Sequence, residues 1–315
     1  MRADAGAGAR DGKGSAPMTW RGILDAGVAG LRAAGIREAE LDGWYLFEAA
    51  FGMDRAHFIM DQRRAAGGAD FEGKRELFDG YIRRRQRRIP LQHILGNQEF
   101  MGLHFFVNEH VLIPRQDTET LVEEILKDCL AGELKSRLGR EPRILDMCTG
   151  SGCIAVSLAR LGGYGRVTGA DISPEALRVA GINGASICGE HGPSWALSDL
   201  YGSVPGTFDI IASNPPYIPS RVIEELEPEV KDHEPRRALD GGGDGLFFYR
   251  RMAEESAAHL TDGGRLYLEI GCEQAADVTG LLREAGYENI QVIKDGPGLD
   301  RVVKAVRPQA GGLHV

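Results

Sequence analysis

Apolar runs with helix-like and strand-like spacing alternate from residue 118 onward, and this alternation restricts the possible folds more than any other feature of the chain. The expected elements are helix 118–131, strand 143–147, helix 154–160, strand 166–171, helix 174–181, strand 208–213, helix 247–259 and strand 265–270. Strands that alternate with helices pair in parallel, because each helix carries the chain back across the sheet. Residues 114–308 are therefore predicted to form an α/β domain on a doubly wound sheet.

The end of this domain breaks the alternation. A helix over residues 274–285 is followed by two strands, 290–294 and 301–306, with only residues 295–300 between them. A parallel crossover needs about a dozen residues or more, so this connection is too short for one. The last strand is therefore predicted to run antiparallel to its neighbours.

The segment 18–90 is predicted to form a separate helical domain. Thr19 can cap a first helix that Gly35 ends, and a second helix is expected to end at Gly52. Glycine suits these positions because it adopts the left-handed conformation that closes a helix. Two further helices are expected near residues 56–60 and 71–82.

Residues 91–113 are predicted to be a β-hairpin that links the two domains. Their apolar spacing changes to a period of two, and Asn108 and Glu109 supply turn chemistry. Residues 1–17, which are rich in Gly and Ala, and residues 309–315 are predicted to be disordered, with Met18 as an alternative start.

Composition and charge limit the class of protein. With 43% hydrophobic and 26% charged residues, the chain resembles soluble globular domains, and no apolar run approaches the roughly 20 residues of a membrane span. The net charge of −9 argues against broad non-specific binding to nucleic acid, which needs a basic surface. The five cysteines include no CxxC pair, so we expect neither a disulfide framework nor a metal site, and we expect a cytoplasmic location.

The stretch ILDMCTGSGCIAVSLA predicts a strand, a tight glycine turn and a helix whose N-terminus points at a ligand. Asp146 ends the strand, and Gly150 and Gly152 let the backbone approach that ligand. Asp171 ends the next strand, where a carboxylate can accept hydrogen bonds from both hydroxyls of a ribose. A purely structural turn, or a nicotinamide or flavin site, would also fit, although the G-x-G-x-x-G order of dinucleotide sites is missing.

The stretch SNPPYIPS ends a strand on an amide, two prolines and an aromatic ring. Open α/β sheets bind ligands at this edge. We therefore expect one pocket to be surrounded by Asp146, Gly150, Asp171 and Asn214. The NH2 group of an amide substrate has two donors, which the Asn214 side-chain oxygen and the Pro215 carbonyl could accept while Tyr217 packs on the planar group. The alternative interpretation is a simple proline-rich turn.

The motifs NPPY, ILDMCTGSG and GLDRVVKAV together resemble class I S-adenosylmethionine-dependent methyltransferases that act on amino nitrogens. The blocks PLQHILGNQEF, VLIPRQDTETLVEEIL and EPRRALDGGGDGLFFYR closely resemble the protein-(glutamine-N5) methyltransferase family, also called HemK-like, which modifies peptide chain release factors. The resemblance runs from about residue 20 to residue 307. It implies a helical substrate-recognition domain, a hairpin linker and a Rossmann-like methyltransferase domain.

The resemblance also implies a reaction and its residues. The methyl donor would be S-adenosylmethionine, and the substrate would be the glutamine in the Gly-Gly-Gln loop of class 1 release factors. The substrate motif is matched by Asn214, Pro215, Pro216 and Tyr217. Cofactor contacts are expected from Asp146, Cys148, Thr149, Gly150, Ser151, Gly152, Asp171, Asp199, Leu200 and Asn214. Neither a membrane nor direct DNA binding is expected.

Two positions depart from the family pattern. Cys148 stands where glycine is common, which leaves open whether this position has a positive φ. Leu200 follows Ser198-Asp199 where an aromatic residue is frequent, which would weaken stacking on the adenine.

Two charged groups have two interpretations each. The basic cluster is either a solvated helix end or a patch for an acidic or RNA-associated partner, and consists of Arg83, Arg84, Arg85, Arg87 and Arg88. Arg115, Asp117 and Glu119 either line the cofactor entrance or cap the next helix.

Two other functions compete with glutamine methylation. An N6-adenine DNA methyltransferase also carries NPPY, but it would need a target-recognition domain and a basic cleft, for which this acidic chain has no obvious room. A non-catalytic adaptor that binds release factors would not need the intact NPPY motif.

Overall fold

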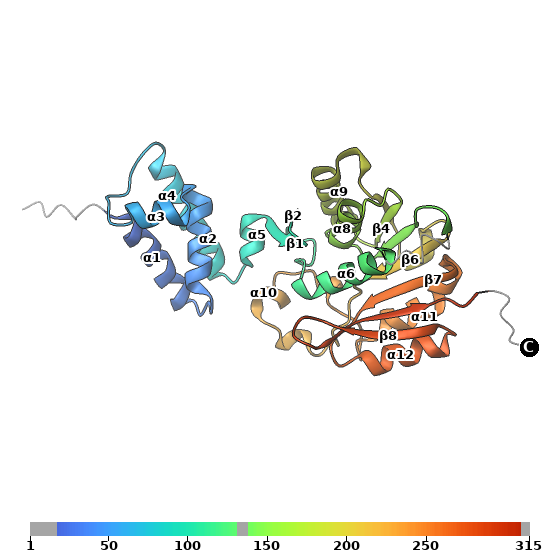
Figure 1. The fold of residues 1–315 in the computed structure, drawn as a ribbon. Helices are drawn as coiled ribbons and strands as arrows, with labels where there is room; N and C mark the ends of the chain where they lie inside the picture. Colours follow the sequence, from blue (N-terminus) through green and yellow to red (C-terminus); the bar gives the residue numbers. More distant parts are fainter. Residues whose placement is uncertain (1–17, 131–137, 310–315) are drawn as a thin grey trace, which may run out of the picture. The chain divides into compact units, whose positions relative to one another are not determined.

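The structure is a computed structural model that describes residues 18–130 and 138–309. The predicted disordered segments lie outside these residues, except for Gln309. The chain divides into two compact units, Met1–Leu95 and Gly96–Val315 (Figure 1). Among the described residues, no helix is both long enough and apolar enough to cross a bilayer.

The described part of the first unit is helical, as predicted. Its helices are α1 (Trp20–Ala33), α2 (Ala39–Phe51), α3 (Arg55–Asp61), α4 (Phe71–Gln86) and α5 (Leu91–Leu95). The Thr19 side chain accepts a hydrogen bond of 3.1 Å from the backbone N–H of Gly22, and Gly52 ends α2 with a φ of 67°. Phe47 is fully buried among aromatic rings from α1, α2, α3 and α4 and forms the centre of this unit's core.

The basic cluster at the end of α4 is not uniformly solvated. Phe78, Ile82 and Arg85 lie four and three residues apart, on the buried side of the helix. Arg85 donates a hydrogen bond of 2.7 Å from Nε to Oδ2 of Asp42, which is also buried. The interpretation of this cluster as a solvated face is therefore wrong for Arg85, because its helical position turns the side chain toward α2.

The second unit contains a hairpin and a seven-stranded sheet with the order β5-β4-β3-β6-β7-β9-β8. The sheet strands are β3 (Ile144–Met147), β4 (Val167–Asp171), β5 (Ser194–Leu197), β6 (Phe208–Ser213), β7 (Leu260–Glu269), β8 (Glu288–Lys294) and β9 (Asp300–Val306). Pairing is parallel from β5 to β7, and β9 runs antiparallel to both of its neighbours. The predicted doubly wound sheet with an antiparallel last strand is thus confirmed.

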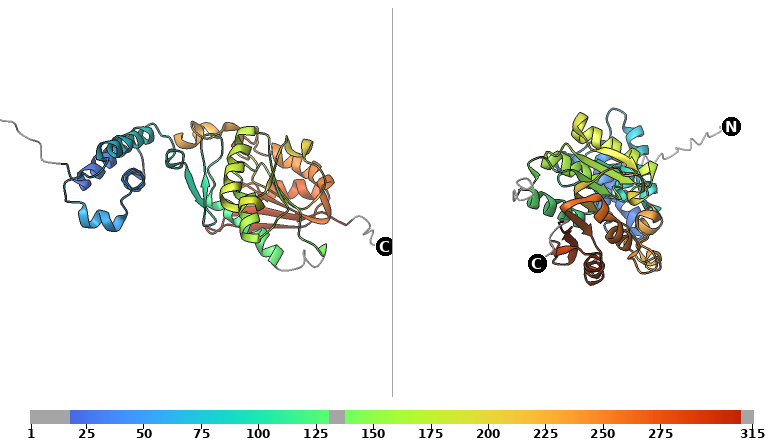
Figure 2. Two further views of the ribbon diagram at one scale, coloured as in Figure 1. Left: turned by 90° about the horizontal axis from the view of Figure 1, so that it is seen from above. Right: turned by 90° about the vertical axis from the view of Figure 1, so that its right-hand side faces the viewer.

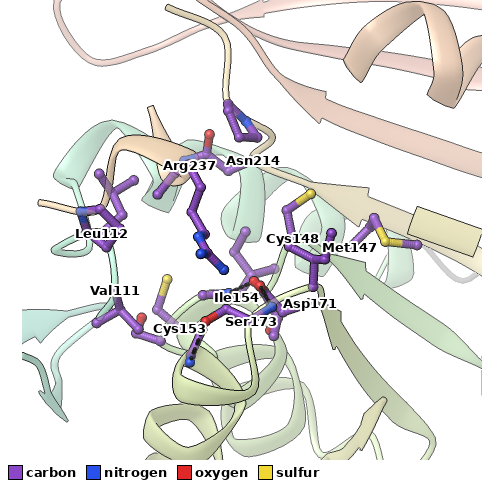
Figure 3. A pocket seen from close by; sticks show the side chains of 18 of the residues that line it. Val111, Leu112, Met147, Cys148, Cys153, Ile154, Asp171, Ser173, Asn214 and Arg237 are labelled. Atoms are coloured by element: carbon purple, nitrogen blue, oxygen red, sulfur yellow. Dashed lines mark hydrogen bonds between the residues drawn. The ribbon is translucent and has the colours of Figure 1, made fainter. Parts of the chain in front are cut away.

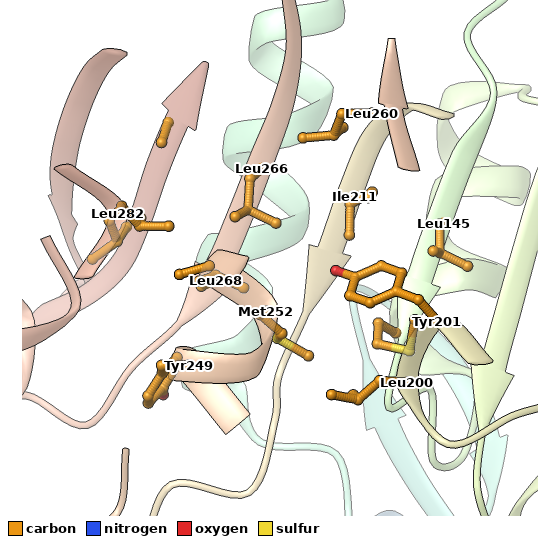
Figure 4. Close-up of a cluster of buried hydrophobic side chains, with 14 of the residues drawn as sticks. Leu145, Leu200, Tyr201, Ile211, Tyr249, Met252, Leu260, Leu266, Leu268 and Leu282 are labelled. Carbon is orange, nitrogen blue, oxygen red and sulfur yellow. The ribbon is translucent and has the colours of Figure 1, made fainter. Parts of the chain in front are cut away.

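Helices cover both faces of this sheet (Figure 2). They are α6 (Gln116–Leu130), α8 (Cys153–Gly162), α9 (Pro174–Cys188), α11 (Phe247–His259) and α12 (Ala275–Glu284). The connections also contain the short helix α10 (Pro228–Lys231) and 3-10 turns at Gly189–His191, Leu200–Ser203, Ile223–Glu225 and Arg236–Ala238. Ile144 packs with residues of α6 and α8, whereas its neighbour Leu145 packs with α11 and α12 on the other face. Figure 4 shows the second of these cores, in which Met252 and Leu282 face the strands.

The predicted hairpin forms, but its position along the chain differs from the prediction. β1 (Asn97–Phe100) and β2 (Leu103–Phe106) are joined at Met101 and Gly102, whose φ angles are 53° and 70°. Two consecutive positive φ angles make the tight turn that suits a two-residue hairpin. The predicted turn at Asn108-Glu109 does form, since the backbone N–H of Val111 donates a hydrogen bond of 3.3 Å to the Asn108 carbonyl, but it follows the hairpin and does not join its strands. Val111 and Ile113 are buried in an irregular segment instead of a strand.

The boundary between the units also differs from the predicted linker. Residues 91–95 are helical and belong to the first unit, whereas the hairpin belongs to the second. Phe100 and Phe105 lie in the core that α6 and α8 share with the sheet. Asn183 of α9 accepts a hydrogen bond of 2.7 Å from the backbone N–H of Phe106. The hairpin is thus an integral part of the second unit.

Near the sheet edge, one strand was not predicted and one helix is longer than predicted. β5 is a four-residue edge strand that is only partly buried, so it lacks the apolar run that reveals a strand in the sequence. Helix α9 continues to Cys188 instead of ending at Gly181. A Cβ at Gly184 would lie 3.0 Å from the Trp195 ring, so this glycine allows close packing against β5 and does not end the helix.

Candidate active site

A cavity of about 530 Å³ opens at the carboxyl ends of β3, β4 and β6 in the second unit (Figure 3). Most of the predicted site residues line it: Cys148, Thr149, Gly150, Ser151, Asp171, Asp199, Leu200, Asn214 and Pro216. Four others do not: Asp146, Gly152, Pro215 and Tyr217. Of the four residues predicted to surround one pocket, Gly150, Asp171 and Asn214 line the cavity and Asp146 does not.

The glycine turn between β3 and α8 bends through three left-handed residues. The φ angles are 61° at Cys148, 53° at Gly150 and 80° at Gly152. At Gly152 a Cβ would lie 2.9 Å from the Trp195 ring and 3.1 Å from the Ala180 Cβ. Cys148, which stands where the family often has glycine, thus adopts the conformation that favours glycine.

Asp146 supports this turn from inside the protein. Its Oδ2 accepts hydrogen bonds from the Thr149 hydroxyl at 2.5 Å and from the backbone N–H of Ala155 at 3.1 Å. The residue is fully buried, and burial raises the pKa of its carboxyl group to about 7. Asp146 therefore shapes the turn through Thr149 and does not face the cavity.

Asp171 lies at the end of β4 and holds two backbone groups at the cavity wall. Its Oδ2 accepts a hydrogen bond of 2.9 Å from the backbone N–H of Gly150, and its Oδ1 accepts one of 2.8 Å from Ser173. Burial raises the pKa of this carboxyl group, while both N–H groups act in the opposite direction. Because each carboxylate oxygen can accept a further bond, Asp171 can also receive two hydroxyl groups.

Asp199 and Leu200 follow β5 and line the cavity. Asp199 Oδ1 accepts a hydrogen bond of 2.8 Å from Nη1 of Arg251. Leu200 has a φ of 43°, lines the cavity and is buried in the core drawn in Figure 4. Both departures from the family pattern, Cys148 and Leu200, thus adopt left-handed conformations at this cavity.

Asn214 comes directly after the fully buried strand β6 and lines the cavity. Its Nδ2 donates a hydrogen bond of 3.2 Å to the Thr118 hydroxyl in the first turn of α6. Tyr217 is partly buried and packs against the core, and its backbone carbonyl accepts a bond of 3.1 Å from Gln274. Burial raises the pKa of the Tyr217 hydroxyl to about 12, so the phenol is protonated at neutral pH.

The structure separates the two interpretations of Arg115, Asp117 and Glu119, which lie at the start of α6. Arg115 lines the cavity and donates a hydrogen bond of 2.5 Å to the buried carboxylate of Glu234. Asp117 instead forms an ion pair of 3.2 Å with Arg301, and Glu119 accepts a bond of 2.6 Å from the backbone N–H of Met101. Only Arg115 therefore belongs to the cavity wall.

Several wall residues were not identified from the sequence. They include Val111, Leu112, Ile172, Ser173, Arg237 and Phe248. Figure 3 shows the Arg237 side chain reaching across the cavity toward Asp171, and its charge lowers the pKa of that carboxyl group. In the sequence, Arg237 lies in the block EPRRALDGG, which resembles a block of the family. The block alone assigns no role to any of its residues.

Comparison with known proteins places the chain in a family. A family model described as the PrmC N-terminal domain matches residues 23–96, and one described as the methyltransferase small domain matches residues 124–229. The release factor glutamine methyltransferase of Geobacter sulfurreducens is 39% identical over 294 residues, which are 91% of this chain and 97% of the relative. The chain belongs to the release factor glutamine methyltransferase family.

Other similarities agree with this assignment. The release factor glutamine methyltransferase of Caulobacter vibrioides is 37% identical over 278 residues, 88% of this chain and 92% of the relative. The solved structure of the hMettl16 catalytic domain is 16% identical, with a TM-score of 0.53, and the match covers 73% of this chain and 83% of that one. That likeness shows the class I methyltransferase fold alone.

The donor set of the cavity fits the methyl donor of this family, S-adenosylmethionine. Asp171 keeps lone pairs that can accept hydroxyl groups, and the wall carries apolar side chains such as Val111, Ile154 and Leu200 that suit a planar aromatic group. A nicotinamide or flavin site, which the glycine turn alone allowed, is not what this family contains.

Proposed function

We propose that this chain transfers a methyl group from S-adenosylmethionine to the side-chain amide nitrogen of the glutamine in the Gly-Gly-Gln loop of class 1 peptide chain release factors. The observation that carries the proposal is the position of Asn214. Its side chain lies in the wall of the cavity at the end of β6, and its Nδ2 is already bonded to Thr118. The amide oxygen of Asn214 therefore remains to accept a hydrogen bond from a substrate.

The bound cofactor supplies a methyl group that its sulfonium already activates. The difficulty lies with the substrate, because an amide nitrogen delocalises its lone pair into the carbonyl. The Asn214 oxygen and the Pro215 carbonyl would accept the two N–H hydrogens, fix the direction of the nitrogen and favour positive charge on it. Pro216 restricts the backbone of this acceptor pair. The residues thus act by orientation and charge stabilisation, and no strong base is required.

The cofactor side of the cavity follows from the residues described above. Asp171 would hold the ribose, and the turn over residues 148–152 would approach the cofactor with its backbone. Asp146 would act only by shaping this turn. Arg115 and Arg237 bring positive charge to a cavity that must receive a cofactor carboxylate.

The first unit is proposed to recognise the substrate protein. Its helices carry neither a glycine turn nor a substrate motif of their own, so the chemistry belongs to the second unit. The family relationship and the net charge of −9 both favour a protein substrate over DNA. Because all five cysteines are free thiols, a cytoplasmic location is part of the proposal.

The test is to incubate the full chain with methyl-labelled S-adenosylmethionine and either a class 1 release factor or adenine-containing DNA. The proposal predicts that only the release factor gains label, and that a release factor with Ala in place of its Gly-Gly-Gln glutamine gains none. Label on the DNA would support the adenine methyltransferase. Binding of the release factor without any label would support the adaptor.

A further inference from the structure

Gln274 directly precedes α12, and its side-chain amide joins three segments of the second unit. Its Nε2 donates a hydrogen bond of 3.1 Å to the backbone carbonyl of Tyr217 and one of 3.3 Å to that of Gly245. Its Oε1 accepts a hydrogen bond of 2.9 Å from the backbone N–H of Gly271, just after β7. One amide thus connects the last residue of NPPY, the glycine loop over residues 241–245 and the end of β7.

The bonding partners of Gln274 determine which way its amide points. A side-chain amide has two N–H donors and one acceptor oxygen, and here both donors and the acceptor are bonded. The flipped amide would place its oxygen against two carbonyls that only accept. Among the described residues, no other donor bonds the carbonyl of Tyr217 or that of Gly245. Loss of the Gln274 amide would therefore leave both carbonyls without a protein partner.

The peptide group between Tyr217 and Ile218 is held on both of its edges. Gln274 bonds its carbonyl, and its N–H, which belongs to Ile218, donates a hydrogen bond of 3.0 Å to the Leu239 carbonyl. The next carbonyl, that of Ile218, accepts a hydrogen bond of 2.9 Å from the N–H of Gly241. Because a peptide group is planar, bonds on opposite edges fix both its position and its tilt.

The glycine loop packs directly on the backbone of NPPY. A Cβ at Gly245 would collide with the Tyr217 carbonyl oxygen and would lie 2.8 Å from Nε2 of Gln274. A Cβ at Gly241 would lie 2.9 Å from the Pro216 carbonyl oxygen. Side chains at these two positions would push the loop away from the motif. The block EPRRALDGGGDG, to whose residues the sequence alone gave no role, thus supplies the surface against which NPPY rests.

The substrate-facing residues of NPPY lie between two fixed points. On one side is β6, which ends at Ser213 and is bonded to both of its neighbours in the sheet. On the other side is the peptide group that follows Tyr217. Pro215 and Pro216 have fixed φ angles, and a residue before proline, such as Asn214, is restricted as well. A shift of the Tyr217 carbonyl is therefore passed back to the Pro215 carbonyl instead of being absorbed between them.

We propose that Gln274 is a positioning residue that clamps the Tyr217 carbonyl and the glycine loop, and so holds the Pro215 carbonyl where it accepts a hydrogen bond from the substrate amide. The effect on rate rests on the proposed function, whereas the clamp itself is independent of any substrate. Gln274, Tyr217 and Gly245 are absent from the cavity wall, so the clamp should act on methyl transfer and not on cofactor binding.

The first test combines single-turnover methyl transfer, at saturating cofactor and release factor, with calorimetric titration of the cofactor. Gln274→Met keeps the length of the side chain and loses every hydrogen bond. Gln274→Glu keeps the shape and the acceptor for Gly271, but a carboxylate cannot donate to two carbonyls. Both variants should transfer the methyl group about 10- to 100-fold more slowly, with unchanged cofactor affinity. Wild-type rates in both variants would overturn the proposal.

A matched control on the same helix is Thr279→Val. Thr279 is 7% exposed, and its hydroxyl donates a hydrogen bond of 3.0 Å to the Ala276 carbonyl within α12. This nearly isosteric change removes a buried hydrogen bond without touching NPPY, so the rate should stay at the wild-type value even if stability falls. An equal loss of rate in the Thr279 and Gln274 variants would show that both act only by weakening α12, and the proposal would fail.

The second test observes the clamp without any substrate. Tyrosine is followed by isoleucine only at residues 81–82 and 217–218. A protein with ¹³C in its tyrosine carbonyls and ¹⁵N in its isoleucines therefore gives two carbonyl–nitrogen NMR signals, and Tyr81→Phe identifies which one belongs to Tyr81. In Gln274→Met the Tyr217 signal should move upfield, because that carbonyl loses its hydrogen bond, while the Tyr81 signal from α4 stays in place.

The two tests separate failure of the clamp from failure of the proposed function. A Tyr217 signal that does not move in Gln274→Met would overturn the inference, as would a signal that moves while the methyl transfer rate stays at the wild-type value. A signal that moves, in a protein whose wild-type form methylates no release factor, would leave the clamp standing and would contradict the proposed function instead.

Discussion

The backbone N–H of Gly150 donates a hydrogen bond of 2.9 Å to Oδ2 of Asp171. This bond joins the glycine turn after β3 to the end of the neighbouring strand β4. Asp171 also binds the N–H of Ser173, the N-cap residue of α9. One carboxylate therefore holds two loops at the cavity while keeping lone pairs for a ligand.

Asp171→Ala should weaken the binding of S-adenosylmethionine. Loss of charge-assisted hydrogen bonds to the ribose costs about 1–3 kcal/mol, and the release of Gly150 adds to this loss. Calorimetric titration measures the change directly. Asp277→Ala, at an exposed position on α12, is the control and should bind as the wild type does. Unchanged affinity in the Asp171 variant would remove this residue from the cofactor site.

The buried pair between Asp42 and Arg85 should dominate the stability of the helical unit. Arg85→Ala leaves the Asp42 carboxylate buried without this guanidinium and should lower the free energy of unfolding by about 3–5 kcal/mol. The double change Asp42→Leu with Arg85→Met should recover most of the loss, because neither member of the buried pair is then charged. Urea unfolding measures these free energies. Arg83→Ala, at an exposed position on α4, is the control, and its free energy of unfolding should lie within about 0.5 kcal/mol of the wild-type value. A mild effect of Arg85→Ala would mean that water reaches the pair.

The two-unit division predicts how truncation separates binding from catalysis. A chain beginning at Gly96 keeps the hairpin and its buried residues Phe100 and Phe105, so it should fold and bind cofactor. Without the first unit it should methylate release factor poorly. A chain beginning at Pro114 loses the hairpin and should fold badly. Full activity of the Gly96 protein would show that the helical unit has only a structural role.

The sequence predicted the buried strands well, because β3 and β6 are buried along their whole length and rich in large apolar residues, and β4 is mostly buried. It failed where tertiary contacts override local signals. Gly181 looked like a helix end, yet α9 continues because glycines on it make room for Trp195. Arg85 looked solvated, yet its position on α4 turns it toward Asp42.

The candidate site was predictable to a similar extent. Turn glycines and strand-end acids carry local signals, so the residues around Gly150, Asp171 and Asn214 were identified and do line one cavity. The hydrogen bond from Asn214 to Thr118 joins segments far apart in the chain, and no local pattern marks it. At Cys148 the sequence left open whether φ is positive, because this angle is set by the fold of the turn and not by the cysteine side chain.

Asp146 should make stability depend on pH. Its pKa rises from 3.8 to about 7 on folding, so the native state keeps a proton that the unfolded chain has lost. The free energy of unfolding should therefore fall as pH rises from about 4 to about 7 and then level off. Asp146→Asn should remove up to about 1.4 kcal/mol per pH unit of this slope. Subtracting the stability curve of the variant from that of the wild type leaves the contribution of Asp146. Carboxyl groups whose pKa is lowered on folding, such as Asp209, contribute equally to both curves. Parallel curves would contradict the raised pKa.

Substitution of Asn214 tests whether NPPY orients the substrate amide. Asn214→Ala should leave the fold and the cofactor affinity nearly unchanged, because within the described residues the side chain makes one hydrogen bond, to Thr118. Loss of a hydrogen bond that acts in the transition state should reduce the rate on the order of 100- to 1,000-fold, or about 2.7–4 kcal/mol. Asn214→Asp keeps an acceptor, but its charge beside the sulfonium favours the bound cofactor over the transition state. This variant should bind cofactor equally or more tightly and transfer the methyl group more slowly.

The most direct measurement is single-turnover methyl transfer to a release factor by the wild type and both Asn214 variants, with mass spectrometry of the peptide that contains Gly-Gly-Gln. The account predicts that the wild type adds one methyl group to the glutamine side chain, and that both variants do so far more slowly while still binding S-adenosylmethionine. Wild-type rates in both variants, or a methyl group on any residue other than this glutamine, would contradict it.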